Sequence, residues 1–595
     1  MQRVFGRAKA TPADLPAPPG PRPPGIATFM LAGAALVASI GLARAGEKPE
    51  LRRAPHIVLI LVDDMGWSDL GCYGGEIETP SVDSLAAAGL RFSAFYNTGR
   101  CCPTRASLMT GLYPHQAGVG RMTFDRGRPG YRGRLGTDTV TIAEVLRAAG
   151  YRTAMVGKWH LSLTEEHEGH MEHLNNRVIR ETFSDPATYP VHRGFDEHYG
   201  IIWGVVNYYD PFSLVHNTTA VASVPEGYYV TDAFTDRAVD EIARCAEDDR
   251  PLFLYLAHCA PHWPLHAPAD DVARYDRTYR VGWQAIREAR YRRQVAMGLI
   301  GPQTTKLSDR FAPALSWDDN PTRDWDARAM ACHAAMIDRV DQGVGRIVAK
   351  LRDLGELEST LILFLSDNGA SREEPRRPGF DRVSQTRDGR DVIYYGGGKP
   401  KEVPPGPETT YAGIGPRWAN AANAPFRLFK ATQHEGGIRT PLVVHWPQGL
   451  RVRPGSITDQ PGHVIDVMAT CIELAGARYP DQHQGRPSVP LEGKSLAPIF
   501  RGEPRPGHEA LCFEHFGAKA IRRGEWKLVA RPGGPWELYH LARDASETVN
   551  LADDHPEKVH TLAATWEAWA HRTNVFPRPV RRPPPTKPSP PRQPD

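Results

Sequence analysis

The stretch HIVLILVDD, residues 56–64, gives the first indication of the fold. Six consecutive apolar residues, several of them β-branched, are followed by two aspartates. A short run of this kind is typical of a strand that is buried on both faces of a sheet. The two acids come where that strand ends. We therefore expect a central strand of an α/β protein, with polar groups at its carboxyl end.

Three further stretches repeat this pattern, and they are YRTAMVGKWH (151–160), PLFLYLAHCAPH (251–262) and TLILFLSDNG (360–369). Helical segments lie between them, such as 79–90, which opens with the helix-start residues Thr79 and Pro80. Strands that alternate with helices predict a mixed, mostly parallel α/β sheet flanked by helices on both faces. Ligands of such sheets bind beyond the carboxyl ends of the strands. We expect one site from the polar residues at these ends, which are Asp63, Asp64, Lys158, His160, His258, His262, Asp367 and Asn368.

The remaining sequence divides the chain into unequal parts. Residues 52–500 are expected to form the catalytic domain, and residues 505–575 a smaller antiparallel α+β domain of short strands followed by a helix. Residues 576–595 are rich in proline and predict a disordered tail. Two further regions, 164–250 and 371–425, are expected to be long loops that wall the site.

The first 45 residues have the features of a targeting segment. Four basic residues precede an apolar stretch, residues 26–43, and a small-residue cleavage site follows at 43–45. This order predicts a signal peptide, residues 1–45, and export to the periplasm or out of the cell. The alternative is an uncleaved signal that anchors the chain to a membrane.

Composition excludes several other classes of protein. The 595 residues carry a formal net charge of only +3, so nothing indicates a nucleic acid or an anionic membrane as a partner. Hydrophobic residues make up 41% of the chain, which is enough for a large core. Eight cysteines without a C-x-x-C pair argue against a structural zinc site.

Oxygen atoms dominate two of the strand ends. Asp63, Asp64, Asp367 and Asn368 offer only hard oxygen ligands, which suit Ca²⁺ or Mg²⁺ and not zinc or copper. Adjacent residues of a strand point to opposite faces, so both members of a pair can face one site only where the strand ends in a turn. The alternative is that "DD" and "DNG" are turn formers without a ligand. The pairing on two strand ends favours the metal.

Cationic side chains are expected around the same point. They are Arg105, Lys158, His160, His262 and Lys430. That many positive groups around a metal held by carboxylates imply an anionic substrate with several acceptor oxygens, such as a sulfate or a phosphate ester. Each of these residues taken singly could also have a role outside a site, as a solvated surface charge or a structural histidine.

The stretch NTGRCCPTRASLMTG, residues 97–111, supplies a candidate nucleophile. Pro103 fits the first turn of a helix that runs to Gly111, so Cys101 would lie at its N-terminus, where anions are favoured. A cysteine there can be a thiolate of low pKa. A thiolate beside a hard divalent cation is nevertheless a poor match, and an oxygen nucleophile would fit better. Cys102 is expected to be a buried or free thiol.

The pattern Cys101-x-Pro103-Thr104-Arg105, continued to Gly111, resembles the signature of the type I sulfatases. The blocks LVDDMGWSDLGCYG, GKWHL, APHWP, LSDNG and KATQHEGGIRTP resemble further motifs of that family, in the family's order. The resemblance covers roughly residues 52–575, and GPRWANAANAPFRLFK is similar to the arylsulfatase branch. It implies an alkaline-phosphatase-like fold. Thr104 stands where serine is commoner in the motif.

The resemblance implies a sulfuric ester hydrolase that cleaves an aryl sulfate or a sulfated carbohydrate. In that family a maturation enzyme converts the cysteine to Cα-formylglycine, whose hydrate is the nucleophile and carries the covalent sulfo-enzyme intermediate. By matching position, Asp63, Asp64, Asp367 and Asn368 resemble the ligands of one Ca²⁺, with Cys101 close to the metal. Arg105 and Lys158 are similar to residues that hold formylglycine and sulfate. His160 resembles the group that takes the proton of the hydrate, and His262, with Lys430, the proton donor at the leaving oxygen.

Other interpretations remain open at this point. A phosphomonoester or phosphonate ester hydrolase could use the same scaffold, and an inactive anion- or carbohydrate-binding protein is a third reading. His167, His170 and His173 are spaced three apart, and Asn217 begins a glycosylation sequon. The natural substrate is expected to depend on the two predicted loop regions.

Overall fold

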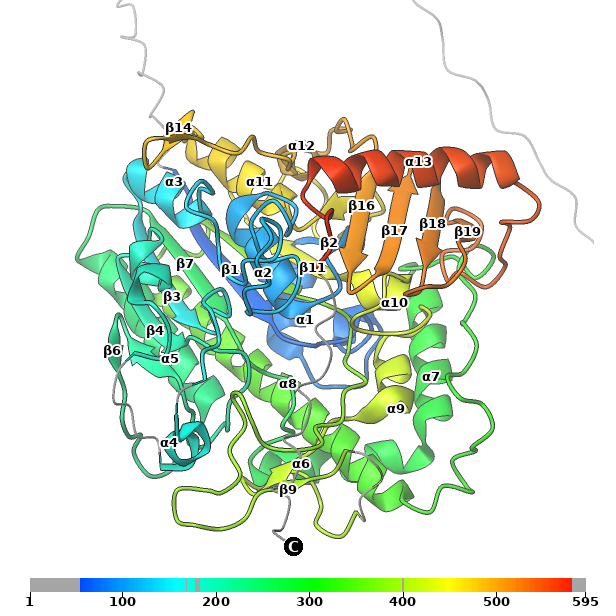
Figure 1. Cartoon of the computed structure of the whole chain (residues 1–595), viewed down its shortest axis with the longest axis horizontal. Helices are drawn as coiled ribbons and strands as arrows, with labels where there is room; N and C mark the ends of the chain where they lie inside the picture. Colours follow the sequence, from blue (N-terminus) through cyan, green and yellow to red (C-terminus); the bar gives the residue numbers. More distant parts are fainter. Residues whose placement is uncertain (1–53, 167, 177–181, 397, 399–400, 580–595) are drawn as a thin grey trace, which may run out of the picture. The chain divides into compact units, whose positions relative to one another are not determined.

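The computed structural model describes residues 54–166, 168–176, 182–396, 398 and 401–579 (Figure 1). The predicted signal peptide, His167 and residues 580–595 of the predicted tail lie outside this part. A mixed sheet of 11 strands occupies its centre, in the order β12-β2-β11-β8-β1-β7-β3-β4-β5-β6, with β13 paired to β2. The strands are β1 (His56–Val62), β2 (Leu90–Tyr96), β3 (Arg152–Gly157), β4 (Glu197–Ile201), β5 (Leu214–His216), β6 (Thr219–Ala220), β7 (Leu252–Ala257), β8 (Thr360–Ser366), β11 (Arg439–His445), β12 (Ser456–Thr458) and β13 (Gly462–His463).

The four strands expected to carry the site are β8, β1, β7 and β3, and they are neighbours in the sheet. Each pair among them is parallel, so their carboxyl ends meet at one edge. Strand β11 runs antiparallel to β2 and β8, and β5 runs antiparallel to β4. The prediction of a mixed, mostly parallel sheet is therefore confirmed.

Helices cover both faces of the sheet, and strand β1 shows why. Its alternate residues enter two separate cores: Val58, Ile60 and Val62 pack with α1, α5 and α8, whereas Ile57, Leu59 and Leu61 pack with α2, α3 and α11. A strand buried on both sides needs an unbroken apolar sequence, which β1 has. The helices are α1 (Pro80–Ala88), α2 (Cys101–Thr110), α3 (Ile142–Ala148), α4 (His170–Asn176), α5 (Val230–Ala243), α6 (Ala269–Tyr275), α7 (Trp283–Ala296), α8 (Arg323–Asp353), α9 (Gly415–Ala422), α10 (Glu435–Ile438), α11 (Asp466–Ala475), α12 (Ala497–Phe500) and α13 (Pro556–Arg572).

Helix α1 begins after Thr79, as its sequence predicts, but the Thr79 side chain does not cap it. The cap comes from α8, where the Asp341 carboxylate accepts hydrogen bonds from the backbone N–H groups of Ser81 (3.0 Å) and Val82 (2.7 Å). Free N–H groups at a helix start need such acceptors. A contact between residues 260 positions apart is not visible in the local sequence.

A four-stranded antiparallel sheet follows the main sheet in the chain, and α13 crosses one of its faces (Figure 1). Its strands are β16 (Leu511–His515), β17 (Ala518–Arg523), β18 (Trp526–Ala530) and β19 (Glu537–His540). Apolar side chains of α13, among them Trp566 and Trp569, pack on Ile521, Leu528 and Leu538 of the sheet. The predicted antiparallel α+β architecture of the C-terminal part is confirmed. We refer to residues 511–572 as the C-terminal sheet and helix.

The expectation that 164–250 is a long loop is wrong for a substantial part of this region. Strands β4, β5 and β6 extend the main sheet beyond β3, and α5 packs against it. These strands have only five, three and two residues, so their alternation was too short to be recognised. Region 371–425 is more irregular, with a two-stranded sheet of β9 (Ile393–Tyr394) and β10 (Thr410–Tyr411), followed by α9.

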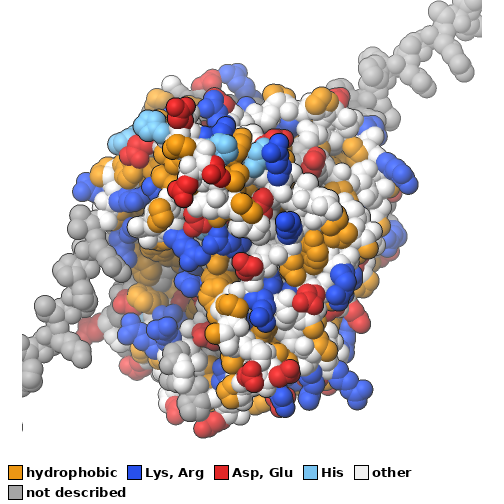
Figure 2. All heavy atoms as spheres, turned by 90° about the vertical axis from the view of Figure 1, so that its right-hand side faces the viewer, with side chains coloured by type: hydrophobic (Ala, Val, Ile, Leu, Met, Phe, Trp, Pro, Cys, Tyr) orange, Lys and Arg blue, Asp and Glu red, His pale blue; other side chains and the backbone are white. Residues whose placement is uncertain are grey.

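The described residues lack several features that would suggest other roles. None of their helices is long and apolar enough to cross a membrane. No disulfide joins the cysteines of this part of the chain. Figure 2 shows one face on which basic, acidic and hydrophobic side chains are intermixed, and the large hydrophobic side chains that are exposed, such as Val281 and Phe516, are few.

Candidate active site

The polar residues at the four strand ends meet at one edge of the sheet, as predicted. The chain leaves the strand geometry directly after β1 and β3, because Asp64 has φ 70° and His160 has φ 55°. These left-handed conformations are uncommon for residues other than glycine. They break the alternation of side chains, so that Asp63 and Asp64 can both face the edge. The turn that the metal hypothesis requires at this strand end is present.

Helix α2 brings Cys101 and Arg105 to the same edge. Cys101 is its first residue, and Gly111 ends it with φ 64°. Because residues i and i+4 share one face of a helix, the two side chains point the same way. The buried Arg105 guanidinium donates to the Lys158 carbonyl oxygen (2.8 Å) and, through Nε and Nη2, to Asp367 Oδ2 (3.2 and 3.0 Å). Arg105 therefore joins α2 to the ends of β3 and β8.

Carboxylates and cations alternate around the centre of the site. Lys158 Nζ donates to Asp63 Oδ2. Lys430 Nζ lies 2.7 Å from Asp64 Oδ1 and 2.9 Å from Asp64 Oδ2. Asn368 Nδ2 donates to Asp64 Oδ1 (2.6 Å), and the Asp64 backbone N–H donates to Asp367 Oδ1 (3.3 Å). Arg105 Nη2 lies 3.4 Å from Asp63 Oδ2 and 3.0 Å from Asp367 Oδ2, so the four predicted metal ligands form one connected group.

Two buried oxygens of this group lack a hydrogen-bond partner, namely Asp63 Oδ1 and Asn368 Oδ1. A buried polar atom without a partner is costly, and a ligand often explains it. Ligand atoms of Asp63, Asp64 and His262 lie within 4.8 Å of one another. Three carboxylates and one amide oxygen are the donor set that a hard divalent cation prefers. The residues present thus fit a bound Ca²⁺ or Mg²⁺.

The acidic residues of the site have opposite pKa shifts. Burial would raise the pKa of Asp63, but the charges of Lys158, His262 and Arg105 outweigh it and lower this pKa to about 2. Burial and the negative charge of Asp63 raise the pKa of Asp367 well above its usual range. The raised pKa of Asp367 therefore reflects the proximity of the two carboxyl groups, which a bound cation would relieve.

Cys101 lies in an electropositive environment. A hydrogen bond from Cys102 and the charges of His160, Lys430 and Lys158 hold the pKa of the Cys101 thiol well below its usual range, against the effect of burial. The Cys102 Sγ also lies 3.4 Å from the Arg121 carbonyl oxygen, which is an alternative acceptor for its single proton, and the thiol is buried and free, as expected. An anion is thus stabilised at position 101, whether it is a thiolate or another group.

The two predicted catalytic histidines lie beside different members of the site, His160 beside Cys101 and His262 beside Asp63 and Asp64. His160 lies beside Cys101, with ligand atoms of Cys101, Cys102 and His160 within 4.8 Å of one another. The Nδ1 atom of His262 is hydrogen-bonded to the Trp263 carbonyl oxygen (2.5 Å), so Nε2 is the ring nitrogen available to the site. Nε2 lies 3.6 Å from Asp64 Oδ2. A carbonyl can only accept, so Nδ1 carries the proton in the neutral ring.

One histidine at a strand end does not join the group. His258 is buried, its ring nitrogens have no hydrogen-bond partner among the described residues, and burial lowers its pKa to about 3. The three-histidine segment also fails to form a site in the described part, because neither His170 nor His173 belongs to a group of potential metal ligands. His167 lies outside the described residues.

Sequence reasoning missed Arg100 and Glu373. Glu373 accepts a hydrogen bond from Arg100 Nη1 (2.6 Å), and its Oε2 lies 3.3 Å from Lys430 Nζ and 3.2 Å from Trp263 Nε1. Although burial would raise the pKa of Glu373, the charges of Arg100 and Lys430 hold it well below its usual range. Arg100 directly precedes Cys101, and this position next to the candidate nucleophile could have indicated that it belongs to the site. Glu373 stands in a charged segment where nothing local distinguishes it.

A central parallel sheet whose carboxyl edge holds buried acids, paired cations and a candidate nucleophile defines a hydrolase of anionic esters. Comparison with known proteins makes the assignment specific. A family model described as Sulfatase matches residues 55–477, and one described as N-sulphoglucosamine sulphohydrolase, C-terminal, matches residues 426–568. The chain belongs to the sulfatase family, has its alkaline-phosphatase-like fold, and is a sulfuric ester hydrolase.

Relatives of the chain extend over most of its length. An uncharacterized sulfatase of Schizosaccharomyces pombe is 32% identical over 560 residues, which cover 89% of this chain and 95% of the relative. An arylsulfatase of Klebsiella aerogenes is 30% identical over 485 residues, covering 78% of this chain and 96% of the relative. The crystal structure of Ps i-CgsB in complex with k-i-k-neocarrahexaose is similar with a TM-score of 0.60 and 25% identity, covering 88% and 98% of the two chains.

Proposed function

We propose that the chain hydrolyses a sulfate monoester of a phenol or a carbohydrate at the edge formed by the ends of β1, β3, β7 and β8. The observation that carries the proposal is the convergence of Arg105, Lys158 and Lys430, all buried, on the acids of this edge. Buried cations on an acidic metal site suit a substrate whose anion has several acceptor oxygens. The neighbour that was solved with k-i-k-neocarrahexaose supports a carbohydrate.

One Ca²⁺ is the metal we propose, held by Asp63, Asp64, Asp367 and Asn368, with Cys101 close to it. The oxygen atoms of Asp63 and Asn368 that lack partners support this assignment. A bound divalent cation supplies positive charge that offsets the charge of the sulfate group. The lysines and Arg105 hold the same anion by donating hydrogen bonds.

Cys101 is the residue we propose as the precursor of the nucleophile, after a maturation enzyme converts it to Cα-formylglycine. The hydrated aldehyde supplies an oxygen nucleophile and a second hydroxyl group. The charges that lower the pKa of the Cys101 thiol would equally favour a deprotonated oxygen at this place. Cys102 has no part in this chemistry.

Proton transfers are assigned to the two histidines. His160, beside position 101, is proposed to accept the proton of the residue there. His262 is proposed to donate a proton from Nε2 to the leaving oxygen when its ring carries protons on both nitrogens, because the Nδ1 proton stays bonded to the Trp263 carbonyl oxygen. Lys430 is held by Asp64 and Glu373 on the same side and would stabilise the negative charge of that oxygen.

The test compares matched aryl sulfate and aryl phosphate esters with purified, calcium-loaded enzyme. We expect kcat/KM to be much higher for the sulfate. A preference for the phosphate would support the rival phosphoester hydrolase. Asp367→Ala should remove both the metal, measured by atomic emission, and the activity, because the ion loses a carboxylate; the exposed Asp481→Ala is the control. Stoichiometric calcium in an active Asp367→Ala enzyme would refute the metal site.

We also propose that the protein is exported, from the features of residues 1–45. The order of basic residues, apolar stretch and small-residue site supports this, and expression of the full chain followed by N-terminal sequencing of the mature protein tests it. A mature chain that begins after Ala45 is the expected result. A chain that retains its first residues in the membrane fraction would favour the anchor.

A further inference from the structure

A cavity of about 600 Å³ adjoins the proposed active site in region 371–425. Glu373 and Trp263 belong to both, since Glu373 contacts Lys430 and the Trp263 ring lies 4.9 Å from that of His262. The cavity is therefore on the side of His262 and Lys430, where the leaving group of the substrate would lie. Its lining consists of Trp263, Phe311, Arg372, Glu373, Glu374, Pro375, Arg376, Arg377, Arg382 and Pro416.

Four arginines give this lining an excess of positive charge. Within the described residues, none of Arg372, Arg376, Arg377 and Arg382 has a carboxylate within 4.0 Å, although most other arginines near the site are paired. Of the two acids, Glu373 is already compensated by Arg100 and Lys430. Guanidinium groups that line one cavity without a carboxylate within 4.0 Å are suited to bind an anion from outside.

Two of the arginines are held in place by neighbouring groups. The Arg372 guanidinium lies 5.3 Å from the centre of the Phe429 ring, and Phe429 in turn packs edge-on against Phe311. Arg382 Nε donates to the Gly379 carbonyl oxygen (3.1 Å), and its guanidinium lies 5.8 Å from the centre of the Phe380 ring. A guanidinium that is already oriented loses less entropy when it binds a ligand. The Trp263 and Phe311 rings supply apolar surface beside these charges.

We propose that this cavity binds a second anionic group of the substrate, and that the enzyme prefers sulfated saccharides that carry at least two anionic groups. The inference rests on the proposed function, because it places the leaving group on the side of His262. The second group is a sulfate or a carboxylate on the leaving-group part of the saccharide. A simple aryl sulfate leaves the arginines without a partner.

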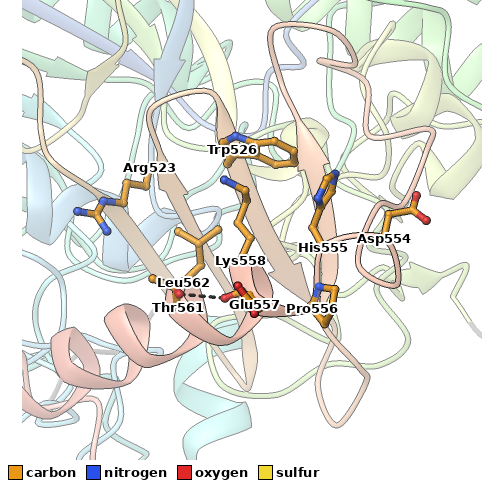
Figure 3. Close-up of a pocket in the computed structure, with 9 residues that line it drawn as sticks. All are labelled: Arg523, Trp526, Asp554, His555, Pro556, Glu557, Lys558, Thr561 and Leu562. Atoms are coloured by element: carbon orange, nitrogen blue, oxygen red, sulfur yellow. Dashed lines mark hydrogen bonds between the residues drawn. The ribbon is translucent and has the colours of Figure 1, made fainter.

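Another cavity, of about 730 Å³, lies on the C-terminal sheet and helix, and the charges of its lining are balanced differently (Figure 3). Lys558 Nζ lies 4.4 Å from the centre of the Trp526 ring, and the His555 ring lies 5.3 Å from it. The indole face is therefore covered by the protein itself. Asp554 and Glu557 also offset Arg523 and Lys558 in this lining. In the arginine-rich cavity, the charge of Glu374 acts on Arg376, but four arginines face only two acids, and Glu373 is already paired with Arg100 and Lys430.

The experiment uses full-length, calcium-loaded enzyme and disaccharides that share one scissile sulfate. One carries no other charge, a second carries an additional sulfate, and a third an additional carboxylate. We expect Arg376→Gln/Arg377→Gln to lower kcat/KM by about 10-fold or more on the doubly charged compounds, the size expected for lost charge-assisted hydrogen bonds. On the singly charged compound and on nitrophenyl sulfate the change should stay within about twofold.

Arg453→Gln is the matched control. Arg453 is exposed and has no carboxylate partner in the described part of the chain, and it follows the antiparallel β11 at the opposite edge of the sheet. It should leave every rate unchanged, so a loss there would indicate general electrostatic attraction and overturn the proposal. Equal losses on singly and doubly charged compounds in the double variant would overturn it as well.

The two sources of the second charge are separated by the two doubly charged compounds. Arg372→Gln should lower kcat/KM for the doubly charged compound, sulfate or carboxylate, that the wild-type enzyme prefers. If the wild-type enzyme cleaves all three compounds equally well, the second subsite does not exist while the sulfatase function stands. If it cleaves none of them and no aryl sulfate, the proposed function itself fails.

Discussion

At the scale of single residues, Asp64 shows how one backbone conformation decides where two carboxylates point. Because Asp64 has a left-handed φ, the alternation of side-chain directions along β1 ends there. Asp63 and Asp64 can therefore both face the carboxyl edge of the sheet. Lys430 then contacts Asp64 from a segment more than 360 residues away in the chain. The meeting of carboxylates and cations at this edge was predictable from residue types at strand ends. The ion pairs around Glu373 were not, because their partners come from distant segments.

If Cys101 is converted as proposed, a peptide that spans residues 97–105 should have one sulfur replaced by oxygen with loss of two hydrogens. Cys101→Ser tests the need for a second hydroxyl. Serine can attack sulfur but cannot expel sulfate by reforming an aldehyde, so the second step becomes slow. The variant should release at most about one alcohol per enzyme and accumulate sulfated Ser at this position.

Mass spectrometry of the quenched variant measures this sulfated peptide. Cys102→Ser is the matched control and should turn over normally, because a serine hydroxyl can replace the thiol as a hydrogen-bond donor and residue 102 takes no part in the proposed bond changes. Sustained turnover by Cys101→Ser without a sulfated peptide would contradict the proposal.

His262 should matter most for leaving groups that are poor. Protonation helps a basic alkoxide more than a stable phenolate, so His262→Ala should lose roughly 10²- to 10⁴-fold on sugar sulfates and clearly less on nitrophenyl sulfate. A series of aryl sulfates of graded leaving-group pKa measures this effect. The slope of log kcat/KM against leaving-group pKa should be steeper for His262→Ala than for the native enzyme. Equal losses across the series would mean that His262 only binds the sulfate group.

At the scale of elements, the long and strongly patterned segments were predictable and the short ones were not. Strands β1, β3, β7 and β8 are buried on both faces and read as apolar runs. Strands β4 to β6 are short and lie toward the edge of the sheet, so their positions follow from pairing with β3 and with one another. The cap of α1 likewise depends on α8, which no local pattern indicates.

The contact between α8 and α1 predicts a pH-dependent stability. Burial raises the pKa of Asp341 to about 6, against the hydrogen bonds from Val82 and Ser81. Because the folded pKa lies above the unfolded value of about 3.9, the stabilising contribution is complete below that value and is lost as pH rises through 6. Relative to Asp341→Asn, the native protein should lose about 2–3 kcal/mol of unfolding free energy between pH 4 and pH 7.5.

Urea unfolding of both proteins at the two pH values measures this difference. Asp353→Asn, near the end of the same helix, is the control and should show no such change. A difference between native protein and Asp341→Asn that stays constant with pH would contradict the assignment.

At the scale of the whole described part, a buried charge cluster joins the C-terminal sheet and helix to the main sheet. Lys527 Nζ of β18 lies 2.7 Å from Glu435 Oε1 and 2.8 Å from Glu547 Oε1. Tyr96 of β2 donates to the other oxygen of Glu435 (2.8 Å). Glu435 begins α10, shortly after Lys430, so the C-terminal sheet and helix also support the segment that carries Lys430.

Removing the central cation of this cluster should be strongly destabilising. Lys527→Met leaves the buried Glu547 carboxylate without its ionic partner and leaves Glu435 with Arg439 (3.3 Å), which costs about 3–5 kcal/mol. Adding Glu435→Gln and Glu547→Gln should recover most of this loss, because neutral amides need no counter-charge. Thermal unfolding measures both. Arg523→Met, which breaks the exposed pair with Glu509, should cost less than about 1 kcal/mol.

The enclosure of α2 has a consequence for the time at which the chain can be modified. Cys101 is 1% exposed, and α2 packs against α11, which begins at residue 466. Residue 466 follows residue 101 by 365 residues, so at about 5–20 residues per second the thiol stays accessible for roughly 20–70 s of synthesis. If Cys101 is converted as proposed, fast expression is expected to leave part of the enzyme in its cysteine form, and slower synthesis is expected to raise the converted fraction.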